Sequence, residues 1–497
     1  MFHHKKERLE TQMTEIRKLR DIVENKQPDL DKLQQKYSNL LYAPAVILAV
    51  SFIMNISCNS DHPLYEVFFA EKEAQYRQDH QDEEFEIDVS STLARIDDAL
   101  QKSQVRMKTL ENHDKKKKLG DLTVSMVAYG FMSARPETAT TLFKTAYDNG
   151  VLFFDTADLY DNGRNEEILG RAIIEMGVSR ESVVIATKGG CKLTAAGFVI
   201  DNSKDYILSA CEKSLARLKT PYIDLYYIHR LADDVNLDEL MQTLKLLRDT
   251  GKIRHIGFSE LTPDQIKTVF YKAAEYDLKI AAIENEVSLW CYDESLIKMC
   301  AEFGIGVVAY SPLGRGFFSE KAKEDFVERM DAKDFRRTLP RFNMHFRENL
   351  QIRAVLENLT RKQSWREGLT ASLEHRVFRP RIASSLSELS LAWLSNLGDH
   401  VVAIPGTNSV DHLQENIWSA CKPFGEVEMA DVFEVLRQTK FVGDRYPPRA
   451  EEMKSLAAAQ ERRPTFPNDQ SFLGGRVDQS AAANLSAQIV KFGFASQ

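Results

Sequence analysis

The sequence predicts an α/β fold, a TIM (β/α)8 barrel, from two observations. From about residue 119 onward, short apolar runs alternate with amphipathic helical stretches, and eight such units can be counted. Three of the runs end in a charged or titratable residue, at Asp155, Lys188 and His229. A short continuous apolar run is typical of a parallel strand that is buried on both faces. The ends of such strands converge on one face of a barrel, which is the face that carries chemistry.

Each unit has local signals for its strand or its helix. Four expected helices are followed by glycine, at Gly150, Gly177, Gly251 and Gly304, the commonest residue after a helix C-terminus. Pro263 suits the first turn of the helix after the fifth strand. The expected strands are 124–130, 151–155, 183–188, 223–229, 255–259, 281–286, 306–313 and 401–404. The expected helices are 137–149, 166–176, 205–218, 237–250, one from 263, 293–303, 349–362 with 384–396, and 410–420.

Composition narrows the class of protein further. The 497 residues exceed one ordinary domain and suit a large barrel with an extension. A hydrophobic content of 43% and a charged content of 28% are typical of a soluble globular protein. The net charge of -8 argues against a general nucleic-acid binder. The 6 cysteines form no C-x-x-C pair or metal-binding cluster, and no secretory signal is evident, so we expect no metal and a cytoplasmic location.

Residues 1–118 are expected to form a helical extension before the barrel. Apolar residues recur every seven positions from Leu9 to Tyr37, a coiled-coil pattern interrupted by Lys26 and Pro28. A similar pattern returns in 91–112. The pattern has two interpretations. It is either a solvated helix with one apolar stripe, or a coiled coil that mediates self-association or binds a partner helix.

Several other stretches depart from the barrel pattern. The apolar segment 40–56 is short for a membrane span and contains a proline, so we do not expect it to cross a membrane. The stretch 42–90 also has the features of an insertion, such as translated intron. The lysine run 115–118 is expected to be a solvated boundary. The arginine-rich insert 363–383 is interpreted as a surface loop or a sequence artefact, and the Ala-, Gln- and Ser-rich tail 457–497 as disordered.

A set of motifs stands in a fixed order along the barrel region. They are D-T-A-x-x-Y at 155–160, G-R-N-E-E-x-L-G-R-A at 163–172, Y-Y-x-H-R at 226–230, S-P-L-G-R-G at 311–316 and I-P-G-T at 404–407. Together they resemble the aldo-keto reductase family over roughly residues 119–456, and within it a subgroup of fungal and bacterial reductases. The resemblance implies a TIM barrel, nicotinamide-dependent carbonyl reduction and NADP(H) as the cofactor.

The resemblance further implies that Asp155, Tyr160, Lys188 and His229 are the catalytic residues. Reduction by hydride needs a proton for the developing alkoxide, and a phenol can supply it when a nearby ammonium lowers its ordinary pKa of about 10. Tyr160 would be the acid and Lys188 the cation, which Asp155 holds in place. His229 would donate a hydrogen bond to the carbonyl oxygen. Each residue alone also has an ordinary structural explanation, and Arg230 is either a site residue or a salt-bridge partner.

The cofactor residues are also implied by the resemblance. Ser259 and Glu284 would contact the carboxamide, and Tyr310 would stack on the nicotinamide ring. The residues expected to wrap the pyrophosphate are Ser311, Leu313, Gly314, Arg315 and Gly316, with Arg315 supplying charge. The residues expected at the adenosine end are Gly406, Thr407 and Asn408 beside the 2′-phosphate, and His412, Glu415 and Asn416 beside the adenine.

The chain departs from the family pattern at three of these places. Glu284 stands where glutamine is usual, and a glutamate donates no hydrogen bond to the carboxamide oxygen unless it is protonated. Asn408 and His412 stand where a lysine or arginine is common, so the preference for NADP over NAD should be weaker. The loop 132–136 is shorter than expected.

Three functions follow as alternatives. The first is NADPH-dependent reduction of an aldehyde or ketone, with a small carbonyl compound as the substrate, and the intact set of four catalytic residues favours it. The second is a cofactor-binding regulatory or interaction protein that acts through its coiled-coil extension, favoured by Glu284, the short first loop and the insert 363–383. The third is a membrane-tethered reductase. The sequence does not indicate the physiological substrate.

Overall fold

The computed structural model describes the barrel region and a few positions before it. The described residues are Glu10, Met13, Thr14, Arg17, 108–194, 197–332, 334–361, 365–366, 377–378, 383 and 385–447. Apart from those first four positions, the expected heptads of 1–41 lie outside the described residues, as do 91–107, the apolar segment 40–56 and the tail 457–497. No helix among the described residues is long and apolar enough to cross a membrane.

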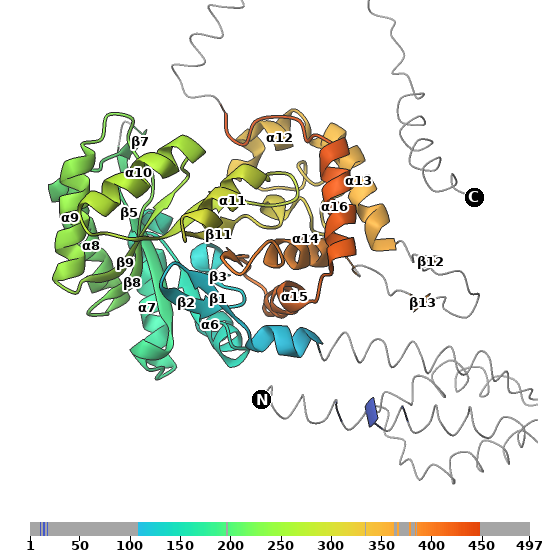
Figure 1. The fold of residues 1–497 in the computed structure, drawn as a ribbon, viewed down its shortest axis with the longest axis horizontal. Helices are drawn as coiled ribbons and strands as arrows, with labels where there is room; N and C mark the ends of the chain where they lie inside the picture. The colour runs from blue at the N-terminus through green and yellow to red at the C-terminus, as the bar shows by residue number, and fades with distance from the viewer. Residues whose placement is uncertain are drawn as a thin grey trace, which may run out of the picture.

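Eight parallel strands form the centre of the described chain, in the order β14-β11-β10-β9-β8-β5-β4-β3 (Figure 1). They are β3 (Tyr129–Gly130), β4 (Phe153–Asp155), β5 (Val184–Gly189), β8 (Ile223–Ile228), β9 (Ile253–Ser259), β10 (Ile280–Glu286), β11 (Gly306–Tyr310) and β14 (Val401–Ala403). The outer strands also meet, because the backbone N–H of Ala128 donates to Ala403 at 3.0 Å and that of Gly130 donates to Pro405 at 3.3 Å. The sheet therefore closes, and the predicted TIM barrel is confirmed.

Closure of the barrel depends on two glycines that face each other. A Cβ added to Gly130 would lie 2.8 Å from the carbonyl oxygen of Ile404, and one added to Gly406 would lie 2.9 Å from the carbonyl oxygen of Gly130. Real Cβ atoms do not approach backbone oxygens so closely, so both positions require glycine. Gly406 therefore has a packing role in addition to the phosphate contact that the sequence suggested.

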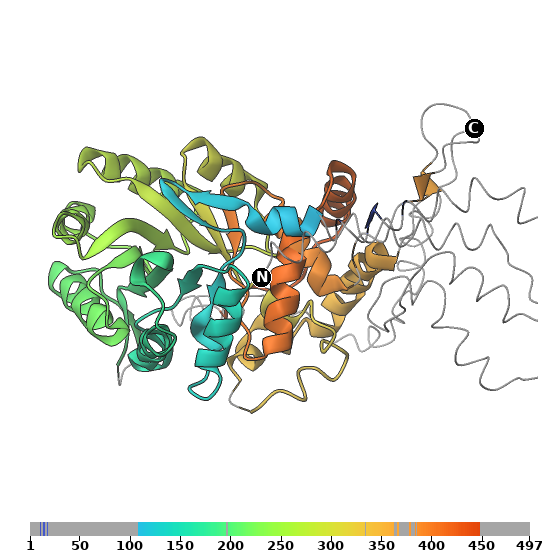
Figure 2. The ribbon, with the colours of Figure 1, turned by 90° about the horizontal axis from the view of Figure 1, so that it is seen from below.

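Helices surround the strands much as the sequence predicts (Figures 1 and 2). They are α6 (Ala139–Asp148), α7 (Arg164–Glu175), α8 (Lys204–Leu218), α9 (Leu237–Asp249), α10 (Pro263–Glu275), α11 (Glu294–Glu302), α13 (Phe346–Arg361), α14 (Leu386–Ser395) and α15 (Val410–Cys421). Local sequence determines where α10 begins, because Thr262 and Gln265 form a capping box around Pro263. The strand expected over 306–313 ends at Tyr310, because Ser311 has a φ of 50° and leaves the extended conformation.

The first expected strand, 124–130, is wrong, because it joins parts of two elements. The chain forms an antiparallel hairpin of β1 (Lys116–Leu119) and β2 (Leu122–Ser125) before it enters the barrel at β3. Leu119, Leu122 and Val124 of this hairpin are buried in one cluster with barrel residues such as Leu225 and Val308. The hairpin thus covers one end of the barrel interior. Its strands are too short, and too rich in lysine, for their pattern to stand out in the sequence.

The lysine run 115–118 is not a solvated boundary as expected, because Lys117 is buried. Alternation along β1 leaves Lys116 and Lys118 exposed and turns Lys117 inward. Its ammonium donates to the carbonyl oxygens of Ser395 and Gly398, both at 2.7 Å. These carbonyls lie at the end of α14, where helix carbonyls need donors and a cation is favoured. Burial lowers the pKa of Lys117 to about 8.

The residues before the hairpin also pack on the barrel. Residues 108–114 are helical, and Figure 2 shows them in light blue against the orange end of the barrel. Leu110 is buried, and the side-chain amide of Asn112 donates to the carbonyl of Cys421 at 3.1 Å. A boundary at 118 would cut through β1. We therefore propose that the folded unit begins at or before residue 108.

Some described elements were not expected from the sequence. β6 (Cys191–Thr194) and β7 (Gly197–Ile200) form a hairpin after β5. A short α12 (Pro340–Asn343) precedes α13, and α16 (Glu426–Gln438) lies beside α13 in both views (Figures 1 and 2). Within the insert 363–383, β12 (Trp365–Arg366) and β13 (Val377–Phe378) pair antiparallel, and nearly all of its other residues lie outside the described part.

We predict that Lys117→Ala lowers the free energy of unfolding by about 1–3 kcal/mol, because the buried carbonyl of Ser395 and the part-buried carbonyl of Gly398 lose their donor. The matched control is Lys116→Ala on the exposed face of β1, which should change it by less than about 0.5 kcal/mol. Urea unfolding followed by circular dichroism measures both. Equal, small effects would show that the buried ammonium contributes nothing to the fold.

Candidate active site

The carboxyl ends of the barrel strands open into a cavity of about 2120 Å³. Of the site residues expected from the sequence, fifteen line this cavity: Asp155, Tyr160, His229, Ser259, Glu284, Tyr310, Ser311, Leu313, Arg315, Gly316, Gly406, Thr407, His412, Glu415 and Asn416. Lys188 lies buried behind its wall, and Gly314 and Asn408 do not line it. The fold therefore brings together residues that are spread over more than half of the sequence.

A buried ammonium lies behind the wall of this cavity. Lys188, on β5, donates hydrogen bonds to the carboxylate of Asp155 and, at 2.9 Å, to the carbonyl oxygen of Thr156. Its Nζ also lies 3.2 Å from Oε2 of Glu284 on β10. Burial alone would lower the pKa of Lys188, but the two neighbouring acids outweigh burial and raise it above its usual value. Lys188 is therefore a permanently charged ammonium.

Tyr160 and His229 stand next to this ammonium. Tyr160 opens the short 3-10 helix η2 (Tyr160–Gly163), and its ring centroid is 5.2 Å from Nζ of Lys188. The rings of Tyr160 and His229 meet edge to face, with their centroids 6.0 Å apart. Desolvation lowers the pKa of His229 well below its usual range, and Lys188 and Arg230 lower it further, so the imidazole is neutral.

The expected lowering of the Tyr160 pKa is wrong. Desolvation raises the pKa of the phenol above its usual value, and the attraction of Lys188 for the phenolate offsets only part of that rise. The acids Glu284 and Asp155 raise it further. The sequence shows that a lysine is near, but not how deeply the tyrosine is enclosed. The phenol therefore keeps its proton, which is the state that a proton donor requires.

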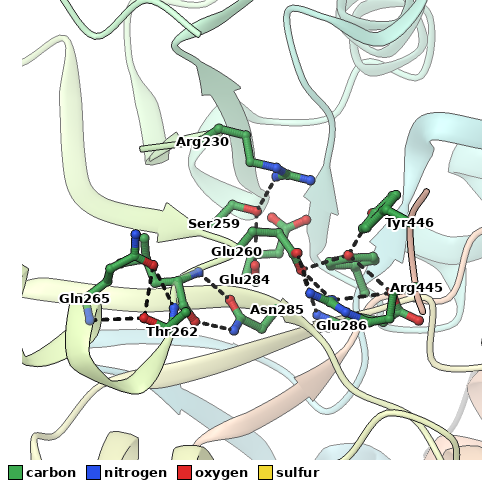
Figure 3. Close-up of polar contacts among 12 residues, drawn as sticks. Arg230, Ser259, Glu260, Thr262, Gln265, Glu284, Asn285, Glu286, Arg445 and Tyr446 are labelled. Atoms are coloured by element: carbon green, nitrogen blue, oxygen red, sulfur yellow. Dashed lines mark hydrogen bonds and ion pairs between the residues drawn. The ribbon is translucent and has the colours of Figure 1, made fainter. Parts of the chain in front are cut away.

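Arg230 lies between the histidine and the expected carboxamide site. Its guanidinium donates to the carbonyl oxygen of His229 at 2.6 Å. It also donates to Oγ of Ser259 at 3.3 Å (Figure 3). The hydroxyl of Ser259 in turn donates to the main-chain carbonyl of Glu284 at 3.0 Å. Within the described residues these partners of Arg230 are uncharged oxygens. Arg230 is therefore a residue of the cavity wall, and the salt-bridge alternative is not supported.

A second polar cluster, missed by sequence reasoning, joins the C-terminal segment 441–447 to the cavity. Arg445 binds both carboxylate oxygens of Glu260, at 3.1 and 2.9 Å, and lies 3.5 Å from Glu286 (Figure 3). The hydroxyl of Tyr446 is 3.1 Å from that of Tyr310, which donates to Glu260 at 2.8 Å. The motif Gly-Asp-Arg-Tyr-Pro at 443–447 was the signal that could have pointed to this contact.

The same cluster changes what was expected of Arg315. Its guanidinium pairs with the buried carboxylate of Glu286 at 3.0 Å and lies 4.7 Å from the ring centroid of Tyr446. Arg315 therefore already has a carboxylate partner, and its charge is not freely available to a pyrophosphate. Glu286 could not be recognised as its partner from the sequence, because the two are 29 residues apart.

The adenosine end also differs from expectation. The hydroxyl of Thr138, before α6, donates to Oδ1 of Asn408, which therefore ties the loop before α15 to α6 rather than lining the cavity. His412 does line the cavity, and its Nδ1 is 3.1 Å from the carboxylate of Glu415. Ser409 caps α15 by accepting from the backbone N–H of His412. Among the described residues, no group of His, Cys, Asp and Glu could hold a metal ion.

Comparison with known proteins identifies the family. The model of the Aldo/keto reductase family matches residues 126–437. The chain belongs to the aldo-keto reductase family. A curated relative, probable aldo-keto reductase 1 of Glycine max, is 35% identical over 312 residues, which are 62% of this chain and 81% of the relative. This aldo-keto reductase is therefore an oxidoreductase, and the resemblance read from its motifs is confirmed.

Solved structures agree with this assignment. An aldo-keto reductase from Bacillus halodurans, solved in its holo form, is 26% identical, covers 66% of this chain and 98% of its own, and superposes with a TM-score of 0.51. A glycerol dehydrogenase from Gluconobacter oxydans is 24% identical, covers 68% of this chain and 98% of its own, and has a TM-score of 0.54. The second likeness shows that the fold is shared.

We predict that Arg445→Met loosens segment 441–447 without unfolding the barrel, because Glu260 loses the guanidinium that binds both of its carboxylate oxygens. Amide hydrogen exchange in 441–447 should become at least about tenfold faster, equivalent to roughly 1.4 kcal/mol of local opening. The matched control is Arg437→Met on α16, whose pair with Glu434 is exposed and of little worth. Equal exchange rates in both variants would mean that Arg445 does not hold the segment.

Proposed function

We propose that this aldo-keto reductase uses NADPH to reduce an aldehyde or ketone to an alcohol, and that Tyr160 donates the proton. The observation that carries the proposal is the placement of Tyr160 in the cavity wall, with its ring centroid 5.2 Å from Nζ of Lys188 and 6.0 Å from the ring centroid of His229. Burial raises the pKa of this phenol, so it holds its proton. A donor must hold its proton before the reaction and lose it during the reaction. The environment of Tyr160 supports both requirements.

Each of the four residues then has one task. Tyr160 transfers its phenolic proton to the carbonyl oxygen, and the ammonium of Lys188 stabilises the phenolate that remains. Asp155 holds Lys188 in position through the hydrogen bond between them. His229, whose Nδ1 has no partner among the described residues, lines the cavity and donates a hydrogen bond to the same carbonyl oxygen from its protonated ring nitrogen. When bound, the reduced nicotinamide supplies the hydride.

The cavity residues fit a dinucleotide of this kind. The cavity runs without interruption from Tyr160 to Asn416 on α15, and its volume of about 2120 Å³ exceeds the ordinary range for ligand pockets. Ser259 and Tyr310 would hold the nicotinamide end. The backbone of the loop 311–316 would approach the pyrophosphate. The N-terminus of α15 would attract the adenosine phosphate through its free N–H groups and its dipole.

The subsite expected for the 2′-phosphate carries little positive charge. Asn408 is turned toward Thr138, and His412 has the carboxylate of Glu415 at 3.1 Å, so a 2′-phosphate would meet no permanent cation from either position. Helix α15 contributes equally to the binding of any nearby phosphate. We therefore propose NADP(H) as the cofactor, with a small preference over NAD(H).

We predict that NADPH binds less than tenfold more tightly than NADH, a difference under about 1.4 kcal/mol. His412→Arg should raise the preference, because it adds a permanent cation at this subsite, and fluorescence titration of both proteins measures the change. A preference of several hundredfold in the wild type would contradict the assignment of this subsite.

We predict that Tyr160→Phe lowers kcat for 4-nitrobenzaldehyde by about 10²–10⁴, the usual contribution of a general acid. The fold and the affinity for NADPH should change little, because the substitution keeps the ring. The matched control is Tyr226→Phe, a buried tyrosine outside the cavity whose hydroxyl has no hydrogen-bond partner among the described residues. Retention of more than about a tenth of kcat by Tyr160→Phe, with chemistry rate-limiting, would instead favour the regulatory alternative.

A further inference from the structure

Two acids, Asp155 and Glu284, flank the one buried ammonium of Lys188 behind the cavity wall. Lys188 donates to Oδ1 of Asp155 and lies 3.2 Å from Oε2 of Glu284. The side chains of Lys188, Asp155 and Glu284 are 0%, 3% and 3% exposed, so water screens none of the three charges. One ammonium balances one carboxylate. A second carboxylate at this depth would be a buried charge without a matching partner, which is costly.

Among the described residues, no other group near Glu284 removes this imbalance. The titratable and charged groups that face it are Asp155 on β4, Tyr160 in η2, Lys188 on β5, Tyr227 on β8, and Arg230 after β8. The phenols of Tyr160 and Tyr227 stay neutral, because burial raises the pKa of both. The guanidinium of Arg230 donates to His229 and Ser259 instead, and forms no ion pair with Glu284 within the described residues.

Each of the two acids also has one buried oxygen that lacks a hydrogen-bond donor. Oδ2 of Asp155 and Oε2 of Glu284 are both buried and, in the described chain, accept no hydrogen bond. Oε2 of Glu284 is within ion-pair distance of Lys188 but accepts no hydrogen bond from it. Both carboxyl groups flank the same ammonium, Asp155 through Oδ1 and Glu284 through Oε2. Ionised carboxylates only accept, so neither can satisfy the other until one of them carries a proton.

We propose that Glu284 is a neutral carboxylic acid in the resting enzyme and shares its proton with Asp155. One proton then supplies the missing hydrogen bond, removes the unmatched charge and leaves Lys188 paired with a single carboxylate. Burial, followed by repulsion from Asp155, raises the pKa of Glu284 to about 8, in agreement with this arrangement. Glu284 is thus a positioning residue, which acts on catalysis through Lys188 and Tyr160.

The proton also changes what Glu284 can offer at the expected carboxamide site. Because its O–H is used on Asp155, its other oxygen remains as an acceptor for the carboxamide NH₂, one of the two functions that a glutamine offers there. This consequence rests on the proposed function. Above about pH 8, loss of the proton would place a second negative charge beside Tyr160 and oppose formation of its phenolate, so kcat should fall there.

The first test observes the proton without cofactor or substrate. Infrared spectra of the full-length protein at neutral pH should contain a protonated carboxyl C=O band that is lost in Glu284→Gln and disappears from the wild type as the pH is raised past about 8. The matched control is Glu286→Gln, which removes a buried glutamate paired with Arg315 and should leave this band unchanged. A wild-type spectrum with no band that titrates in this range overturns the proposal, even if neither variant folds.

The second test uses stability. The folded pKa of Glu284 is raised above its unfolded value, so the native state holds a proton that the unfolded chain releases, and stability falls as pH rises toward about 8. The urea midpoint of the wild type should fall from about pH 5 to about pH 9 by more than that of Glu284→Gln. Parallel curves would overturn the proposal. Both tests are independent of Tyr160, so failure of the proposed function would leave them interpretable.

Discussion

The buried ammonium of Lys188 is the constraint on which the rest of the site depends. A charge at this depth is tolerated only where acids are held against it, and three different strands supply the parts: Asp155 from β4, Lys188 from β5 and Glu284 from β10. Desolvation keeps the phenol of Tyr160 protonated, while the ammonium makes its phenolate accessible during the reaction. Desolvation also keeps His229 neutral, and the same ammonium adds to this effect. Burial and one charge thus act together on the groups around Lys188.

The barrel holds this arrangement in place from both ends. At one end, the hairpin of β1 and β2 fills the interior with apolar side chains, and Lys117 ties it to the end of α14. At the other end, close approach of Gly130 and Gly406 closes the ring of strands beside the cavity. Segment 441–447 adds a third support through Arg445 and its ion pair with Glu260. The site is rigid because strands, rather than loops, carry Asp155, Lys188 and Glu284.

The barrel, and the placement of Asp155, Lys188 and His229 at its strand ends, were predictable because continuous apolar runs end abruptly in these residues, a local signal that needs no three-dimensional information. The hairpin was not predictable, because four residues with three lysines in β1 show no apolar pattern, although alternation buries Lys117. The pairing of Arg445 with Glu260 spans 185 residues of sequence, which no local pattern reports. The direction of the Tyr160 pKa shift depended on a balance between enclosure and charge that only the structure resolves.

The central claim is that Lys188 and Tyr160 act as one proton-donating unit. The most direct test measures kcat for Lys188→Met, Tyr160→Phe and the double variant, with single-turnover kinetics to confirm that chemistry is rate-limiting. Because removal of either residue disables the same proton transfer, the account predicts that the double variant is little slower than the slower single variant. Losses that multiply, so that the double variant is slower by the product of the two single effects, would show independent roles and contradict the account.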